Sequence, residues 1–381
     1  MIIRVIPMWA THAAICPQNL SSAPQFACRA NSRQNLSTIE SPCAVNTTCV
    51  RATIRETHVA MLLALFISLI AAIVPTIFYV LLFYWADRYE REPRWLATVA
   101  FFWGALPAII LSLIAELWIG EPFIETPGTL AGDVVSGSIV APIVEEIFKG
   151  AALFGIYWWK RQEFDGVLDG IIYGALVGFG FAMTENVFYF IGAYDEGGFG
   201  SLSFLIYLRA ILFGLNHAFY TSLIGIGIGI ARHKQSPLAR ALWCTVGLVA
   251  GIFAHALHNL GASLASVNLA IFGVSLLVAG GGLATLLLAI GLAWQHERNV
   301  ISAELSPEVG RLLSHSEYEQ MVGHWRNPER SRRLKERRQM LVEYANRRYR
   351  LRRRGIAQEP ELHEQLAELE SALTHSYVPA A

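Results

Sequence analysis

The sequence has few charged residues. Only 16% of its 381 residues are Asp, Glu, Lys or Arg, whereas soluble proteins typically have about 25%. Hydrophobic residues make up 54% of the chain, and its mean hydropathy is +0.41. The shortage of charge is concentrated between residues 59 and 294. This excludes an ordinary soluble protein and predicts a chain that crosses a membrane several times.

Cysteine is also scarce, which excludes one kind of metal site. Four of the five cysteines lie in the first fifty residues, and Cys-x-x-Cys does not occur. A zinc site made of thiolates is therefore not expected. Other familiar signatures are absent too: there is no His-Glu-x-x-His pair and no pair of intramembrane aspartates. A serine protease based on Ser263 would need a later histidine inside the membrane, but His296 lies among charged residues beyond the apolar sequence.

Long apolar segments dominate the middle of the chain. A membrane-spanning helix needs about 20 apolar residues. Seven such segments can be drawn, near 60–85, 95–119, 134–159, 167–193, 204–230, 239–262 and 268–294. The expected fold is therefore an all-α, polytopic membrane helix bundle with about seven transmembrane helices.

The charges of the connecting segments predict an orientation. Three alternate connections, GEPFIETPGTLAGD, AYDEGGFGSLS and GASLASVN, contain no Lys or Arg. The other connections hold the basic residues Arg88, Arg91, Arg94, Lys160, Arg161, Arg232, Lys234 and Arg240. Basic residues favour the cytoplasmic side. We expect the N-terminus outside and the C-terminus in the cytoplasm.

The two ends of the chain differ from the middle. Residues 1–58 lack an apolar face and a signal-peptide pattern, so we interpret them as a poorly ordered extension, with translation starting near Met61. Residues 59–294 form the expected membrane domain, and residues 295–381 a cytoplasmic tail with short helices. From Arg326 to Arg354, basic residues outnumber acidic ones thirteen to three. We expect this segment to contact anionic membrane lipids, and we expect no nucleic-acid binding, because no aromatic interleaving or folded module supports it.

Polar residues inside four of the predicted spans lie at one depth. They are Glu145, Glu146, Lys149, Glu185, Asn186, Asn216, His217, His255, His258 and Asn259. Ionised side chains are rare inside membranes and are usually functional. Counted from the nearest cytoplasmic basic residue, Glu145, His217 and His255 are each about 15 residues in, or roughly 22 Å along a helix. We expect these groups to meet past the midplane, toward the outer face.

The spacing of these residues suggests water activation, although other readings stay open. Lys149 follows Glu145 by four residues and Glu146 by three, so it can pair with either carboxylate. A carboxylate pair beside a cation suits a general base, and two imidazoles plus a carboxylate suit an open zinc site. The same residues could instead form helix–helix hydrogen bonds and a structural ion pair. A proton-coupled transporter or channel would use them as a relay, and a non-catalytic scaffold or sensor would need none of them.

Five motifs in a fixed order point to a family. They are DRYEREP, PIVEEIFKG, FDGVLDGIIYGALVGFGFAMTENVFY, Arg209 with NHAFYTSLIGIGIG, and HALHN. Over roughly residues 60–262 the chain resembles the PrsW family of intramembrane proteases. That family looks related to the CAAX-prenyl-protease and bacteriocin-processing membrane peptidases, which usually have His where this chain has Glu185.

The resemblance implies a protease of the bacterial plasma membrane that makes a site-1-type cut in a single-span membrane protein, such as an anti-sigma factor. The implied catalytic residues are Glu145, Glu146, Lys149, Glu185, His217, His255 and Asn259. One of the paired glutamates would be the general base, Lys149 would tune their charge, and Asn259 would orient His255 or the scissile carbonyl. Glu185, His217 and His255 would bind zinc or another divalent metal, or stabilise the oxyanion. A glutamate base acting without metal stays open.

Overall fold

The computed structural model describes residues 47–87, 92–123, 129–161, 163–164, 166–323, 332–355 and 360–376. Within these ranges every regular element is a helix. The membrane part comprises α1 Thr47–Ala86, α2 Arg94–Trp103, η3 Gly104–Ala108, α3 Ile109–Phe123, α4 Leu130–Val135, η4 Ser136–Val140, α5 Ala141–Trp159, α6 Val167–Ile206, η5 Tyr207–Leu212, α7 Asn216–Arg232, α8 Pro237–Leu264, η6 Leu269–Ile271 and α9 Phe272–Leu305. The C-terminal part comprises η7 Ser306–Glu308, α10 His315–Val322, α11 Arg332–Arg354 and α12 Pro360–Ser376.

Five helices in the described ranges are long and apolar enough to cross a membrane. They are His58–Ala86, Arg94–Ile119, Val167–Arg232, Pro237–Leu264 and Leu269–Glu308. Three of the seven expected segments account for the difference. The segment 134–159 corresponds to α4, η4 and α5, and its composition is interrupted by Glu145, Glu146 and Lys149. The segments 167–193 and 204–230 both fall within Val167–Arg232, which comprises α6, η5 and α7.

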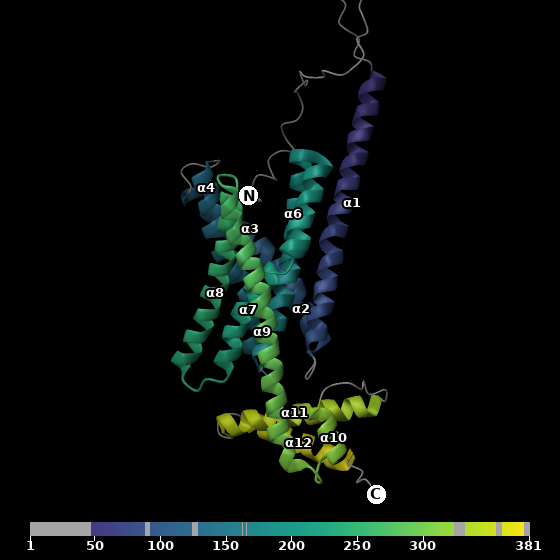
Figure 1. The fold of residues 1–381 in the computed structure, drawn as a ribbon, viewed down its shortest axis with the longest axis vertical. Coiled ribbons are helices and arrows are strands. Elements are labelled where there is room, and N and C mark those ends of the chain that lie inside the picture. The colour runs from purple at the N-terminus through teal and green to yellow at the C-terminus, as the bar shows by residue number, and fades with distance from the viewer. Residues whose placement is uncertain are drawn as a thin grey trace, which may run out of the picture.

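The chain reverses direction inside α6. Gly197 and Gly198 have non-helical backbone angles, and Gly198 has a φ of 66°, which favours glycine. Arg209 Nη2 lies 2.5 Å from Glu185 Oε2, 24 residues earlier in the chain. A straight helix would separate these residues by roughly 36 Å, so the chain must fold back between them. Figure 1 shows this turn at the upper end of α6. The expected loop AYDEGGFGSLS is therefore helical apart from a glycine turn.

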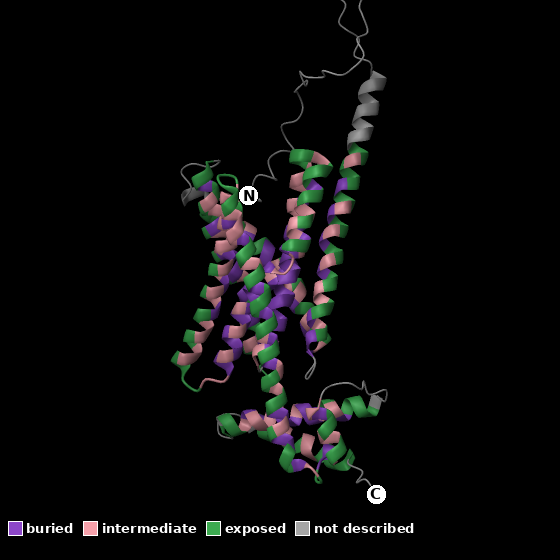
Figure 2. Cartoon of the chain, in the orientation of Figure 1, coloured by how far each residue is buried: buried purple, intermediate pink, exposed green. Residues whose placement is uncertain are grey.

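The bundle is tightly packed where α6 meets α7. Gly170, Gly174 and Gly178 recur every fourth residue along α6, and a Cβ atom on any of them would lie less than 3 Å from the backbone of α7. Small residues at this spacing allow helices to approach closely in membranes. Figure 2 shows that buried residues concentrate in the middle of the bundle and that exposed residues lie along its outer helices. Many of the exposed residues are large and apolar. The close approach places α7, and with it His217, against the centre of the bundle.

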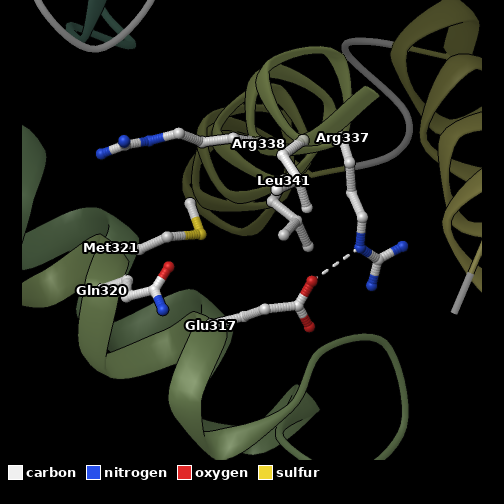
Figure 3. A pocket seen from close by; sticks show the side chains of 7 residues that line it. Glu317, Gln320, Met321, Arg337, Arg338 and Leu341 are labelled. Atoms are coloured by element: carbon white, nitrogen blue, oxygen red, sulfur yellow. Dashed lines mark hydrogen bonds and ion pairs between the residues drawn. The ribbon is translucent and has the colours of Figure 1, made fainter. Parts of the chain in front are cut away.

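The C-terminal helices form a small folded unit with its own core. α9 runs past the expected boundary at residue 294 and ends at Leu305, and α11 and α12 lie across its end (Figure 1). Its buried core consists of Ile301, Leu305, Leu312, Leu313, Met321, Leu341, Val342, Tyr344, Ala345 and Leu373. A pocket lies between α10 and α11, where Glu317 Oε1 accepts a hydrogen bond from Arg337 Nε at 2.9 Å (Figure 3).

The expected extension over residues 1–58 lies largely outside the described residues, and α1 begins at Thr47.

Candidate active site

Four helices bring most of the predicted polar residues together. α5 contributes Glu145, Glu146 and Lys149, α6 contributes Glu185, α7 contributes His217, and α8 contributes His255. All of these residues are buried except His217, which is intermediate. α7 packs between α6 and α8, and α5 packs against all three of these helices; Figure 1 labels α6, α7 and α8.

The Lys149 side chain occupies the centre of this cluster. Its Nζ lies 2.9 Å from Glu145 Oε2, 2.8 Å from Glu146 Oε1 and 3.1 Å from His217 Nδ1. An ammonium group has three N–H donors, so these three acceptors use all of them. The Nζ atom also lies 3.8 Å from the centre of the Phe181 ring, a cation–π contact. The lysine charge is thereby held without any exposure of the side chain.

The two glutamates differ in the number of hydrogen bonds that they accept. Glu146 Oε1 accepts hydrogen bonds from Lys149 and from His255 Nδ1, the latter at 3.0 Å, and its Oε2 accepts from Thr221 Oγ1 at 3.0 Å. Both Glu146 oxygens are thus engaged. The hydrogen bond recorded for Glu145 is the single one from Lys149 to its Oε2. Glu146 is the fixed member of the pair, and Glu145 is the less constrained one.

The contacts of the two histidines define their tautomers. Since Glu146 can only accept, His255 carries its proton on Nδ1, which leaves a lone pair on Nε2, 4.0 Å from Glu145 Oε2. Lys149 donates to His217 Nδ1, so His217 carries its proton on Nε2, which lies 2.9 Å from Glu185 Oε2. The His255 ring also stacks on Tyr220, with 4.7 Å between ring centres. Both imidazoles therefore present an unprotonated nitrogen toward the glutamate pair.

Glu185 holds His217 through a network that the sequence reasoning did not assign to the site. Arg209, on η5, donates to Glu185 Oε2 from Nη2 and to Asn186 Oδ1 from Nε, the latter at 2.8 Å. Its guanidinium also lies 3.7 Å from the centre of the Tyr189 ring. A carboxylate behind a histidine fixes its ring orientation and tautomer. Arg209 could have been suspected, because it is a charged residue inside an otherwise apolar segment.

Asn259 and His258 lie away from the glutamate pair. Asn259 Nδ2 donates to the carbonyl oxygen of Gly137 at 2.8 Å, which ties α8 to η4 just before α5 begins. His258 Nδ1 lies 3.2 Å from Asn216 Nδ2. The predicted role of Asn259 in orienting His255 or the substrate carbonyl stays a prediction. The hydrogen bond that Asn259 makes connects α8 to η4.

The donor set at the centre suits a divalent metal. Glu145, Glu146, His217 and His255 each offer a ligand atom, and these atoms lie within 4.8 Å of one another. Two carboxylates and two imidazoles are ligands typical of zinc. Glu185, which the sequence reasoning placed among the ligands, lies behind His217 and is paired with Arg209.

Comparison with known proteins identifies the family. Residues 92–286, about half of the chain, match the sequence model described as PrsW family intramembrane metalloprotease. The chain belongs to the PrsW family. It is 29% identical over 195 residues to Protease PrsW of Bacillus subtilis (strain 168), which covers 51% of this chain and 82% of that protein. It is 28% identical over 195 residues to Protease PrsW of Halalkalibacterium halodurans, covering 51% and 83%. No solved structure gives a significant match.

PrsW membership confirms the predicted enzyme class and location. The protein is a membrane-embedded peptidase of a family whose members named above are bacterial, and its apolar helices fit a multi-pass membrane protein. The metalloprotease description applies to the family as a whole. A third relative, Protease PrsW of Clostridioides difficile (strain 630), is 34% identical over 103 residues, or 27% of this chain and 42% of that protein.

Proposed function

We propose that the protein is an intramembrane endopeptidase in which Glu145 is the general base. The observation that carries this assignment is the asymmetry of the glutamate pair. Glu146 accepts hydrogen bonds through both oxygens, whereas Glu145 accepts one, at Oε2, and this oxygen lies 4.0 Å from His255 Nε2. A base must have an oxygen free to take a proton from water. Glu145 meets this requirement, and Glu146 does not.

The remaining residues position this base. Lys149 offsets the charge of the two carboxylates, and the hydrogen bond from His255 to Glu146 fixes the ring whose Nε2 faces Glu145. Glu185 fixes His217. In the reaction, water would lose a proton to Glu145 as its oxygen attacks the peptide carbonyl. The same proton would then pass to the departing amine, which leaves both atoms and charges balanced.

A divalent metal would be held by Glu145, Glu146, His217 and His255. When bound, it supplies Lewis-acid polarisation of the carbonyl oxygen and lowers the pKa of water. Zinc is the metal that this donor set favours.

The proposed topology has seven crossings, with the N-terminus outside and the C-terminus in the cytoplasm. The reversal at Gly197 and Gly198 supports two crossings within Val167–Arg232. The packing of α5 against α6, α7 and α8 supports a further crossing. Exposed tryptophans support one common boundary: Trp158 and Trp159, at the end of α5, are 78% and 83% exposed. Tryptophan is enriched at membrane interfaces. The Lys160 Nζ lies 5.5 Å from the Trp95 ring, which supports a basic residue at that same boundary.

The proposed substrate is a single-span membrane protein, such as an anti-sigma factor, cut near the outer end of its helix. The depth of the cluster, past the midplane from the basic boundary, supports this position. The proposed lipid contacts involve the exposed residues Arg333, Lys335 and Arg353 of α11. Other arginines of α11 are paired within the protein: Arg347 with Glu343, and Arg348 with Glu304 and Glu308.

The experiment that tests this function uses purified protein in proteoliposomes with a single-span substrate. Mass spectrometry of the products locates the cut. We expect cleavage within the outer half of the substrate helix, and we expect His217→Ala to abolish it while leaving the protein folded. Ion flux or solute uptake that depends on the same residues, without any peptide cleavage, would contradict the proposal and favour a transporter.

A further inference from the structure

Lys149 and a metal ion would compete for the same donor side chains. The Lys149 ammonium hydrogen-bonds to Glu145, Glu146 and His217, which are three of the four residues that could ligate a metal. Its Nζ lies between 2.8 and 3.1 Å from one oxygen or nitrogen atom of each of these three side chains. The four possible metal-ligating atoms all lie within 4.8 Å of one another. A zinc ion would need distances of about 2.0–2.2 Å to oxygen and nitrogen atoms of these side chains. The ammonium therefore occupies the space between them and takes the lone pair of His217 Nδ1.

We propose that Lys149 is the resident cation of this donor set, and that a divalent metal binds only when the Lys149 ammonium has left it. Two positive charges sharing two carboxylates in a dry interior would repel strongly, because few water molecules screen them. His217 Nδ1 has a single lone pair, so it can accept from Lys149 or ligate a metal but cannot do both.

The surroundings of Lys149 make its departure costly. The side chain is fully buried, and Phe181 covers the ammonium at 3.8 Å. A lysine that moves away from the glutamates loses these three hydrogen bonds and its contact with Phe181. Metal binding to the wild-type protein must overcome this loss. We therefore expect its metal affinity to be lower than the affinity of the same donor set without the lysine. This inference concerns cation binding, and it holds whether or not the proposed role of Glu145 is correct.

The test measures metal affinity directly. Full-length protein in detergent is titrated with Co²⁺, followed by its visible absorption, and with Zn²⁺ in competition. We compare the wild type with Lys149→Met, which keeps the length of the side chain and removes its charge. Lys160→Met is the matched control, because Lys160 lies at the end of the same helix and contacts Trp95 and Trp159 instead. We expect Lys149→Met to bind metal at least tenfold more tightly than the wild type, and Lys160→Met to match the wild type.

A second variant shows where the metal binds. Adding His217→Ala to Lys149→Met should abolish the gain, because it removes one of the four donors. A gain that persists would place the metal elsewhere and overturn the proposal. Equal affinities in the wild type and in Lys149→Met would overturn it too, because the lysine would then not compete.

Removal of Lys149 leaves two buried carboxylates without their cation, so Lys149→Met can fail to fold without metal. Recovery of a monodisperse, thermally stable protein when zinc is supplied during purification would support the proposal. If neither condition yields folded protein, the wild type decides. One equivalent of zinc that the wild type retains through dialysis against a chelator would contradict the proposal, and loss of metal to the chelator without loss of the fold would support it.

Discussion

His255 Nδ1 donates a hydrogen bond to Glu146 Oε1 across 3.0 Å, and this contact joins α8 to α5 in the centre of the bundle. It ties the orientation of the imidazole to the helix that carries the glutamate pair. Because the proton is on Nδ1, the opposite nitrogen of His255 faces Glu145 with its lone pair. A carboxylate that accepts a hydrogen bond from one ring nitrogen of a histidine fixes the tautomer and the ring orientation, and so leaves the lone pair on the other nitrogen.

Thr221 should stabilise the protein through Glu146. Its hydroxyl is buried and donates to Glu146 Oε2 at 3.0 Å. Thr221→Val keeps the shape and leaves that oxygen without its donor, at an expected cost of about 1–3 kcal/mol. We expect a lower melting temperature in detergent. Thr285→Val is the control, because the Thr285 hydroxyl is exposed and bonds only within its own helix. An equal effect of both variants would contradict the assigned role of Thr221.

Gly178 should be essential for placing His217. A Cβ atom at this position would lie 2.4 Å from the carbonyl oxygen of His217. Gly178→Ala must push α7 away from α6, at an expected cost of about 1–3 kcal/mol, and should reduce cleavage strongly. Gly155→Ala on α5 is the control, since nothing lies within 4 Å of its Cβ position. Thermal unfolding and substrate cleavage, measured on both variants, check this prediction. Full activity of Gly178→Ala would show that the approach of α6 to α7 is not required.

Arg209 should act through Glu185 and His217 and should not touch the substrate. Arg209→Met removes the cation that pairs with Glu185. The Glu185 carboxylate, and the His217 imidazole that it holds, then lose their fixed orientation. Loss of such an outer partner typically costs about 10–100-fold in activity. We expect kcat to fall more than KM rises. Lys234→Met, a change of a basic residue near the end of α7, should have no such effect. A rise in KM alone would assign Arg209 to substrate binding.

The C-terminal unit should lose stability in acid through Glu317. Partial burial raises the pKa of this carboxyl, but the hydrogen bonds from Arg337 and Ser314 outweigh it, and the net pKa is lowered from its usual 4.5. A lowered pKa in the folded state means that the stabilisation is complete above about pH 4.5 and is lost as the pH falls through the folded-state value.

Amide hydrogen exchange in α10 and α11, corrected for the intrinsic effect of pH, checks this expectation. Protection should fall as the pH drops below 4.5, and Glu317→Gln should weaken protection at neutral pH and flatten the dependence. Glu319→Gln is the control, because Glu319 is 69% exposed on the same helix. An unchanged pH dependence in Glu317→Gln would show that another group controls acid stability.

The sequence predicted that membrane helices form and that the polar groups meet. It predicted the path of the chain between helices and the partners of individual side chains less well. Apolar length and helical rise were sufficient, because a residue's depth in a span depends mainly on its distance from the boundary. Five apolar helices confirm a multi-pass membrane protein, while the count of seven and the orientation stay predictions. The glycine turn at Gly197 and Gly198 was expected as a loop, since its polar composition gave no sign that the flanking residues would remain helical.

Side-chain partners could not be predicted from spacing alone. Glu145, Glu146 and Lys149 lie on one helix, so their contacts follow from the helical period. The contacts of Asn259 with Gly137 and of Arg209 with Glu185 depend on how separate helices rotate against each other. The core of the C-terminal unit was missed for a different reason. Its apolar residues are spread over four helices and the connection before α10, and four of them lie in the basic segment 326–354, whose composition suggested a surface tail.

Cleavage by Glu145→Gln measures the central assignment most directly. The substitution keeps the size of the side chain and removes its ability to accept a proton from water. Wild type, Glu145→Gln and the exposed control Glu196→Gln are reconstituted with the same single-span substrate, and initial rates are compared after circular dichroism and melting confirm the fold. We expect Glu196→Gln to match the wild type and Glu145→Gln to lose about 10²–10⁴-fold, the usual contribution of a general base. A correctly folded Glu145→Gln variant that cleaves at the wild-type rate would contradict the assignment of Glu145 as the base.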